Sequence, residues 1–167
     1  MHLRPATPSD AAALAALILS HRAALTLDVD GAGAEKFLDS VSEAALRSYI
    51  VSERYTYTVL EDGGRIVGFI AMRDRTHLFH LFVAHAYQRQ GWARRMWERA
   101  CGSALDNPHA TSFTVNSSPG AVPVYRRFGF IEAAPPVQMH GIAFVPMVLA
   151  SGENGAAPCG AQPSGPG

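Results

Sequence analysis

The residues best suited to chemistry form a short polar turn between an apolar segment and an amphipathic one. They are Gln88, Arg89, Gln90, Gly91, Trp92, Ala93 and Arg94. Glycine has no Cβ, so a bulky group can approach the backbone there. Free N–H groups at the start of a helix attract anions, whereas arginines there are otherwise unfavourable. The turn therefore predicts an anion site, and a solvated arginine face on a surface helix is the alternative explanation.

A second polar turn, Asn116-Ser117-Ser118, is followed by a helical stretch that contains Tyr125. A phenol is neutral at pH 7 and can donate a proton, because its pKa is ordinarily about 10. Tyr125 is thus a candidate general acid, and a core aromatic residue is the plainer interpretation. His80 is a candidate base, because imidazole titrates near neutral pH. A buried structural histidine is the plainer interpretation for that residue.

No metal site is predicted. His77 and His80 are three residues apart on an expected strand, so we expect them on opposite faces, which argues against a shared ion. The sequence also has no C-x-x-C or H-E-x-x-H spacing.

Hydrophobic periodicity predicts the elements that position these residues. Residues 78–83 suit a strand buried on both faces, and the apolar positions between 93 and 104 recur as one face of a helix. Thr7 and Pro8 predict a helix start. The other expected elements are helices within 34–52, divided near Ser40 and Ser42, and at 119–128, and strands at 55–60, 65–72, 112–115, 130–133 and 138–149.

The two polar turns resemble the two signatures of the GNAT family, the acetyl-CoA-dependent N-acetyltransferases. Residues 88–93 resemble its Q/R-x-x-G-x-G/A turn, which Leu81-Phe82-Val83 precedes at the family's distance. Residues 116–130 resemble the second signature, a polar turn and a helix that ends in Tyr, a few residues, and Gly-Phe. The resemblance implies an α/β (α+β) fold: a mixed, mostly antiparallel central sheet with helices on both faces and a V-shaped opening between the strands that precede the motifs.

The resemblance also implies roles for these residues. The backbone of Arg89 to Arg94 would bind the diphosphate of acetyl-CoA. The strand at Leu81 to Val83 would pair with the pantetheine arm and supply the oxyanion donor. Tyr125 would protonate the departing thiolate, and Asn116 and Ser118 would contact the cofactor.

The sequence departs from one branch of the family. Enzymes of that branch that use a glutamate base on the strand before the second motif would carry it at Phe113. The base is therefore open between His80, His77 on the same strand, a water chain, and an acceptor amine that is already neutral. The resemblance places the acceptor wall in residues 34–52, and it allows a homodimer.

Composition limits the other possibilities. The chain has 167 residues, 48% of them hydrophobic, which predicts one domain at 1–150 followed by a disordered Gly-, Pro- and Ser-rich tail at 151–167. Its 14 basic residues balance 14 acidic ones, which disfavours nucleic acid and anionic membranes as partners. With no apolar run of membrane-spanning length and no signal segment, we expect a cytoplasmic protein. The resemblance implies that it acts on a small-molecule or peptide amine.

Two rival functions use the same residues. A non-catalytic acyl-CoA sensor or interaction module would bind the cofactor without turnover, since a fold does not fix a function. A nucleotide- or dinucleotide-binding protein would use the same turn, but the Rossmann fingerprint requires three glycines, and this turn has one.

Overall fold

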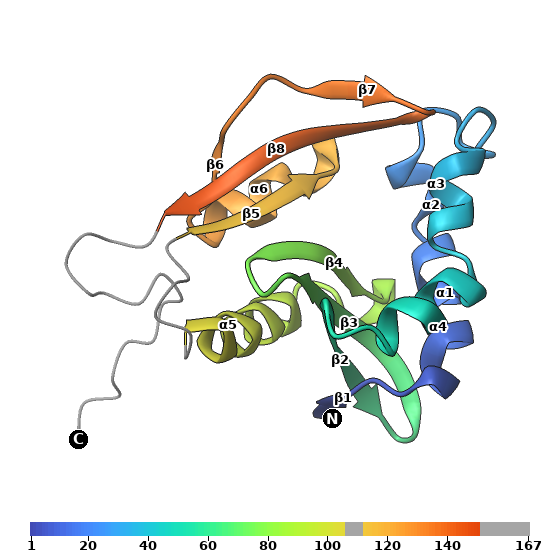
Figure 1. The fold of residues 1–167 in the computed structure, drawn as a ribbon, viewed down its shortest axis with the longest axis vertical. Helices are drawn as coiled ribbons and strands as arrows, with labels where there is room; N and C mark the ends of the chain where they lie inside the picture. Colours follow the sequence, from blue (N-terminus) through green and yellow to red (C-terminus); the bar gives the residue numbers. More distant parts are fainter. Residues whose placement is uncertain (106–111, 151–167) are drawn as a thin grey trace.

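One sheet organises the chain (Figure 1). The computed structural model describes residues 1–105 and 112–150, so the tail expected at 151–167 lies outside the described residues. The strands follow the order β1-β2-β3-β4-β5-β8-β6, with β7 paired to β8. They are β1 (His2–Pro5), β2 (Tyr55–Asp62), β3 (Arg65–Arg73), β4 (His77–Val83), β5 (Ser112–Ser117), β6 (Ile131–Glu132), β7 (Val137–Met139) and β8 (Ile142–Ala150).

The pairing confirms the predicted mixed, mostly antiparallel sheet. All the strand pairs of the described residues are antiparallel except β4 with β5, which is parallel. A parallel pair needs a crossover connection, and here that crossover contains the longest described helix, α5 (Trp92–Leu105).

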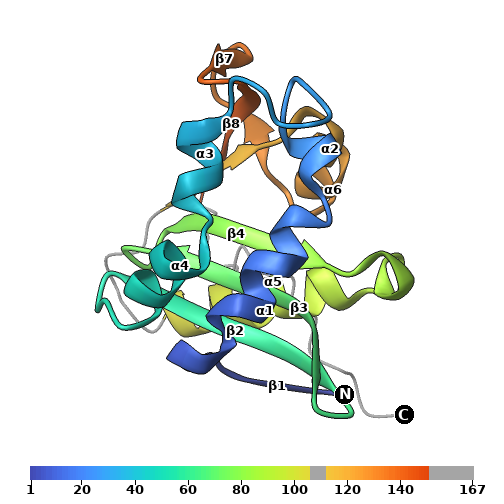
Figure 2. The ribbon, with the colours of Figure 1, turned by 90° about the vertical axis from the view of Figure 1, so that its right-hand side faces the viewer.

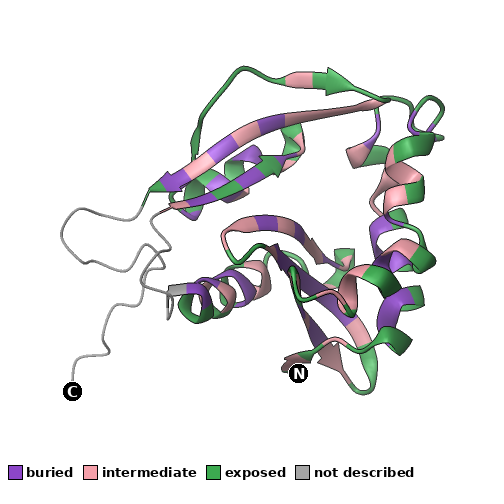
Figure 3. Cartoon of the chain, in the orientation of Figure 1, coloured by how far each residue is buried: buried purple, intermediate pink, exposed green. Residues whose placement is uncertain are grey.

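Helices cover both faces of the sheet, as predicted (Figures 1 and 2). One face packs on α1 (Ala11–Leu19) and α4 (Glu43–Ile50), and the other on α5 and α6 (Val122–Arg127). Figure 3 shows the buried residues lining the inner sides of both layers. The remaining helical segments are η1 (Pro8–Asp10), α2 (Arg22–Leu25), α3 (Glu35–Ser40), η2 (His85–Tyr87) and η3 (Pro119–Ala121).

The periodicity of α5 and the break before α4 follow the sequence. Met96 and Trp97 are buried on the inner side of α5, whereas Arg95 and Arg99 are exposed. Ser42 caps α4 by accepting a hydrogen bond from the backbone N–H of Ala45 at 3.3 Å. The predicted division of residues 34–52 into two helices is therefore confirmed.

The strand expected at 138–149 is wrong as a single element. His140 and Gly141 both have positive φ, 50° and 72°, and they turn the chain between β7 and β8. Two adjacent left-handed residues are the geometry of a two-residue type I′ hairpin. The prediction of a single strand failed because residues that favour strands flank the turn directly on both sides.

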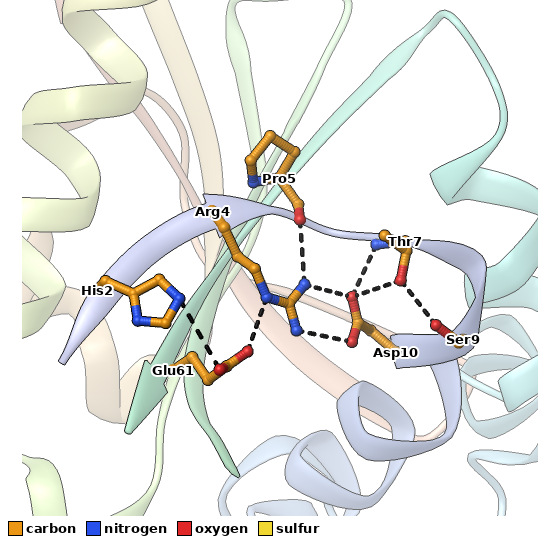
Figure 4. Close-up of polar contacts among 7 residues, drawn as sticks. All are labelled: His2, Arg4, Pro5, Thr7, Ser9, Asp10 and Glu61. Carbon is orange, nitrogen blue, oxygen red and sulfur yellow. Dashed lines mark hydrogen bonds and ion pairs between the residues drawn. The ribbon is translucent and has the colours of Figure 1, made fainter. Parts of the chain in front are cut away.

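The start of the chain is tied to the sheet by an ion-pair network (Figure 4). Arg4 of β1 donates to Asp10 at 2.8 and 3.1 Å and to Glu61 of β2 at 2.7 Å. Asp10 also accepts from the backbone N–H of Thr7 at 2.7 Å, which fixes the start of η1. Mainly because of the hydrogen bonds from Arg4, the pKa of Asp10 is lowered to about 2.

The segment after α2 contacts the β7–β8 hairpin. Thr26 forms an isolated antiparallel bridge with Ile142, and the N–H of Leu27 donates to Gly141 O at 2.8 Å. A Cβ on Gly141 would lie 2.4 Å from the carbonyl carbon of Gly33, so glycine is required at this close approach. We call this contact between residues 26–33 and the β7–β8 hairpin the strap. In Figure 2 the loop between α2 and α3 meets β7 and β8 at the top of the view.

Candidate active site

The sheet opens where β4 leaves β5. Among the described residues the two strands pair only at His77–Thr114 and Leu78–Val115, and β4 then continues to Val83 beside β3 alone. In the ladder geometry of a sheet, strand residues point N–H and C=O groups alternately towards each neighbour. The stretch from Phe79 to Val83 therefore presents backbone groups towards the opening. This is the V-shaped opening that the resemblance implied.

A β-bulge sits at the point of separation. Ala71 of β3 pairs with His80 and Met72 pairs with Leu78, so Phe79 is the extra residue of β4. A bulge interrupts the alternation of side chains. The rings of Phe79 and His80 accordingly stack at 4.1 Å on the face covered by α1 and α4.

The bulge overturns one expectation. His77 pairs with Arg73, whose guanidinium lies over the Phe79 ring at 5.4 Å, so His77 shares a face with Phe79 and His80. The prediction that His77 and His80 lie on opposite faces was wrong, because it assumed unbroken alternation. The described residues nevertheless contain no group of three or more His, Cys, Asp or Glu side chains that could hold a metal ion.

His80 is buried among aromatic rings. Its Nδ1 lies 3.3 Å from the Tyr57 hydroxyl group, and Phe69 and Phe82 contact its ring. Burial lowers the pKa of His80 to about 3, so the ring is neutral at pH 7. His77 is half-buried, with its Nδ1 2.8 Å from Thr114 Oγ1, and burial lowers its pKa to about 4.

The predicted anion site is a run of free backbone amides. In the described part of the chain, no acceptor is bonded to the N–H groups from Arg89 to Arg94, and α5 begins within this run. Arg89 and Gly91 have positive φ, 61° and 81°, which turns neighbouring N–H groups towards one side. A Cβ on Gly91 would meet no atom within 4 Å, so the backbone there is open to a ligand.

The arginine side chains at this helix start are partly occupied. Arg94 donates to Arg127 O at 2.8 Å and lies over the Phe128 ring, while Arg95 lies over Trp92. Arg94 also approaches Glu98 at 3.8 Å. These contacts hold the guanidinium groups beside the turn, so their positive charge remains near the free amides.

Two histidines that the sequence did not indicate meet the side chain of Gln88. Gln88 Nε2 lies 3.1 Å from Val83 O, 3.2 Å from His21 Nε2 and 3.4 Å from His85 Nδ1. The rings of His21 and His85 lie 4.4 Å apart. His21 lies far from Gln88 in the sequence, at the end of α1, and no local pattern predicts such a contact.

Tyr125 and the second turn lie on the other side of the opening. The ring of Tyr125 packs on Phe128 and Phe130, and burial raises the pKa of its hydroxyl group above the usual value. No described residue hydrogen-bonds this hydroxyl group, and no described side-chain N or O atom is both buried and unbonded. The Tyr125 oxygen therefore keeps a small exposed area, although the residue as a whole is buried.

The polar residues in and after β5 point alternately to its exposed side and to its buried side. Asn116 is exposed on the same side of β5 as Thr114, and Ser118 follows the strand as the residue before η3. Ser117, which points the other way, is buried and donates to Ser118 O at 2.8 Å. Phe113 is fully buried against Trp97 at 5.3 Å, so this strand position belongs to the core.

Two hollows lie near these elements. One of about 120 Å³ lies between α2, η3 and β8, next to the strap, and is lined by Ala24, Leu25, Thr26, Leu27, Pro119, Gly120 and Ala143. A larger one of about 660 Å³ lies over η1 and α4. The larger hollow includes no residue of either motif, so we attach the chemistry to the opening and not to it. None of the described helices is long and apolar enough to cross a membrane.

Solved structures share this fold. A GCN5-related N-acetyltransferase from Rhodopseudomonas palustris is 20% identical with a TM-score of 0.69, covering 90% of this chain and 95% of its own. The PaiA N-acetyltransferase from Thermoplasma acidophilum, solved with coenzyme A, is 13% identical with a TM-score of 0.68 and coverages of 90% and 98%. The putative acetyltransferase YncA from Salmonella typhimurium, solved with acetyl-CoA, is 20% identical with a TM-score of 0.64 and coverages of 93% and 96%.

The sequence also matches a family description over most of its length. The acetyltransferase (GNAT) domain matches residues 25–151, which is well over half of the 167 residues. The matched range contains both polar turns and the open edge of β4. This chain therefore belongs to the GNAT family of acetyltransferases.

Proposed function

We propose that the protein transfers an acetyl group from acetyl-CoA to a primary amine of a small molecule or peptide. The observation that carries this proposal is the run of unbonded N–H groups from Arg89 to Arg94, next to the open edge of β4. Such amides at a helix start bind phosphate groups. The coenzyme A and acetyl-CoA found in the PaiA and YncA structures support the choice of ligand.

In this proposal the cofactor follows the elements already described. Its diphosphate binds the turn of Gln88, Arg89, Gln90, Gly91, Trp92, Ala93 and Arg94. Its pantetheine arm lies along Leu81 to Val83, where strand-like backbone groups have no second neighbour. Asn116 and Ser118 face it from β5 and the turn that follows.

The chemistry requires one nucleophile, one oxyanion site and one acid. The neutral amine attacks the thioester carbonyl carbon, and the carbonyl oxygen becomes an oxyanion that a backbone N–H of β4 stabilises. Collapse of this adduct breaks the C–S bond, and the thiolate takes a proton from the Tyr125 hydroxyl group. Burial raises the pKa of this phenol, so Tyr125 carries its proton at pH 7 but is a weaker acid than an exposed tyrosine.

His80 is the proposed side chain for the proton released by the amine. It is neutral at pH 7 and lies at the bulge, where β4 opens. Its low pKa makes it a weak base, so we expect a smaller effect from His80→Gln than from Tyr125→Phe. An amine that binds in its neutral form needs no side-chain base.

The decisive experiment measures free thiol released from acetyl-CoA over a panel of amino acids, polyamines, aminoglycosides and peptide N-termini. We expect at least one amine to release thiol, and Tyr125→Phe to lower kcat by about 100-fold, the usual contribution of a general acid. The variant should bind coenzyme A and melt like the wild type, because the ring that packs on Phe128 and Phe130 is retained. If coenzyme A fails to raise the melting temperature of the wild type, the proposal is wrong.

Phe113 favours one second candidate, a non-catalytic acyl-CoA sensor. A buried Phe occupies the position at which a glutamate base would be expected. A sensor would bind coenzyme A but release no thiol with any amine of the panel. Thermal stabilisation together with turnover rules it out.

A further inference from the structure

We propose that His21 and His85 are positioning residues for the cofactor turn, and that they hold it only while both rings are neutral. They act through the Gln88 amide, which connects α1, η2 and the end of β4. This inference rests on the proposed function, because it concerns the same turn. Neither histidine belongs to the residues assigned to the cofactor or to catalysis above.

The protonation of each ring follows from its partners. His21 Nδ1 lies 2.9 Å from Leu17 O, and His85 Nε2 lies 3.4 Å from Ser20 O. Carbonyl oxygens only accept, so these two nitrogens carry the hydrogens. In neutral rings the opposite nitrogens, His21 Nε2 and His85 Nδ1, are then acceptors.

The orientation of the Gln88 amide follows in the same way. Val83 O lies 3.1 Å from Gln88 Nε2 and can only accept, so the NH₂ group, and not the amide oxygen, points into this cluster. The same NH₂ group faces His21 Nε2 at 3.2 Å and His85 Nδ1 at 3.4 Å. The NH₂ group has two hydrogens, so one is donated to Val83 O and the other is shared by His21 Nε2 and His85 Nδ1. Both ring nitrogens can accept this shared hydrogen only when both histidines are neutral.

Protonation breaks this match. A hydrogen on His21 Nε2 or His85 Nδ1 would point at the hydrogens of the Gln88 NH₂ group. Turning the amide over would satisfy the imidazolium, but it would place the amide oxygen against Val83 O. Gln88 would thus lose its hydrogen bonds either to the two histidines or to Val83 O at the end of β4. The turn that starts at Gln88 would then be held by fewer hydrogen bonds.

His85 and Gln88 are exposed to water, but no described carboxylate compensates for the added charge. From β4, Phe82 contacts the His21 ring at 5.6 Å and brings no charge. Among the described residues neither histidine forms an ion pair with a carboxylate, and Ser20 Oγ is the other polar side chain at His21. The charged residues adjacent in sequence are Arg22, whose Nε donates to Val29 O, and Arg89 in the turn. Both are positive, so they oppose a second charge here.

The test compares coenzyme A affinity at pH 8 and pH 5.5, because histidine changes charge in this interval. Isothermal titration calorimetry is run on the wild type and on His21→Gln/His85→Gln, whose amide oxygens can accept from Gln88 but bind no proton. The phosphates of coenzyme A also titrate, and this contribution is common to both proteins. We expect Kd to rise on acidification about fivefold more in the wild type, the equivalent of one hydrogen bond of about 1 kcal/mol.

The control is His140→Asn, an exposed histidine of the β7–β8 turn, and this variant should keep the wild-type pH dependence. Equal pH dependence in the wild type and the double variant overturns the inference, as does tighter wild-type binding at pH 5.5. If the wild type binds no coenzyme A at pH 8, the proposed function itself has failed, which is a distinguishable result. A double variant that melts much earlier than the wild type at pH 8 is replaced by His21→Gln alone, to which the same criterion applies.

Discussion

At the scale of single residues, one dihedral angle shapes the cofactor turn. Gly91 has φ +81° and open space around its missing Cβ, so Gly91→Ala strains the backbone without a steric clash. A left-handed alanine costs about 1–2 kcal/mol, which the turn can relieve by changing shape. We expect the Kd for coenzyme A, measured by calorimetry, to rise about tenfold while the fold is retained.

The matched control is Gly102→Ala in α5, where a Cβ also meets open space but no positive φ is involved. Alanine favours a helix over glycine by about 1 kcal/mol, so this variant should be more stable and bind coenzyme A normally. If both variants bind like the wild type, the left-handed turn is not what holds the cofactor.

A second residue-scale prediction concerns the acid stability that His80 controls. Burial lowers its pKa from about 6.5 to about 3, so the folded state takes up a proton less readily than the unfolded chain. The free energy of unfolding should therefore fall as the pH drops below about 6.5, by up to about 1.4 kcal/mol per pH unit for this group. Urea unfolding at pH 7, 5.5 and 4.5 should give a shallower dependence for His80→Gln.

His77 contributes in the same direction, because its pKa is also lowered, to about 4, and it remains in the variant. Some acid sensitivity should therefore persist in His80→Gln. Identical slopes for the variant and the wild type would show that His80 is protonated as easily in the folded protein as in the unfolded chain.

The sequence predicted the features of the candidate site that local residues determine and missed those that depend on long-range contacts. The Gly91 turn and the helix after it could be predicted, because local residue types determine both. His21 and His85 could not be linked to Gln88, since His21 is 67 residues away. The sequence of β4 contains no Gly or Pro that would indicate a bulge at Phe79. For this reason the faces of His77 and His80 were predicted wrongly.

At the scale of elements, the N-terminal anchor decides how η1 and α1 meet the sheet. Asp10 is nearly buried and accepts from Arg4 and from the Thr7 N–H. Asp10→Asn should lower the free energy of unfolding by about 2 kcal/mol, the value of a hydrogen bond to a charged group. Its pKa of about 2 lies below the usual value of about 3.9, so the contribution is present above that value and lost as the pH falls towards 2.

The control for this prediction is Asp74→Asn. Asp74 pairs with Arg54 at 2.8 Å, and both side chains are more than half exposed. Exposed ion pairs contribute less than about 1 kcal/mol, so this variant should unfold almost like the wild type in urea. Equal losses for the two variants would mean that burial adds nothing to the Arg4–Asp10 pair.

Helices and strands could be predicted wherever the periodic pattern of apolar residues extended over enough positions. The buried stripe of α5 and the β2–β3 hairpin with its Gly63-Gly64 turn agree with the sequence. The β7–β8 turn was missed because His140-Gly141 is a weaker hairpin signal than Asn-Gly or Asp-Gly. Ser42 as a helix cap, by contrast, was visible in the sequence as a break between two helical stretches.

At the scale of the whole molecule, the strap joins the loop after α2 to the β7–β8 hairpin. Gly141→Ala places a Cβ 2.4 Å from Gly33 and also has a positive φ of 72°. Gly64 also has a positive φ, +82°, but a Cβ there would meet no atom within 4 Å. Gly64→Ala therefore measures the effect of backbone strain without a steric clash. We expect Gly141→Ala to lower the melting temperature clearly more than Gly64→Ala.

The same comparison should extend to turnover once an acceptor is known. Displacement of the strap should raise KM for the amine more than KM for acetyl-CoA, because the strap includes no residue of the Gly91 turn. Gly64→Ala should leave both constants unchanged. Equal effects of the two glycine variants on KM would show that the strap does not influence binding of the amine.

Residue patterns predicted the single helices and strands better than they predicted the overall architecture. Alternating elements indicate only an α/β protein, and the open sheet with helices on both faces was expected because of the resemblance in two short motifs. The described structure confirms it through the two-pair ladder between β4 and β5. The strap was not predicted, since it depends on contacts between residues more than a hundred positions apart.

The bridge between Thr26 and Ile142 has a consequence for synthesis. A ribosome makes residues 26–33 early, but the hairpin that they contact emerges only when almost all of the described chain has been translated. Residues 26–33 are therefore among the first to be made and among the last to gain this partner. A message truncated before codon 140 should give a chain without the strap, and without the β8 residues that pack in the same core cluster as α5.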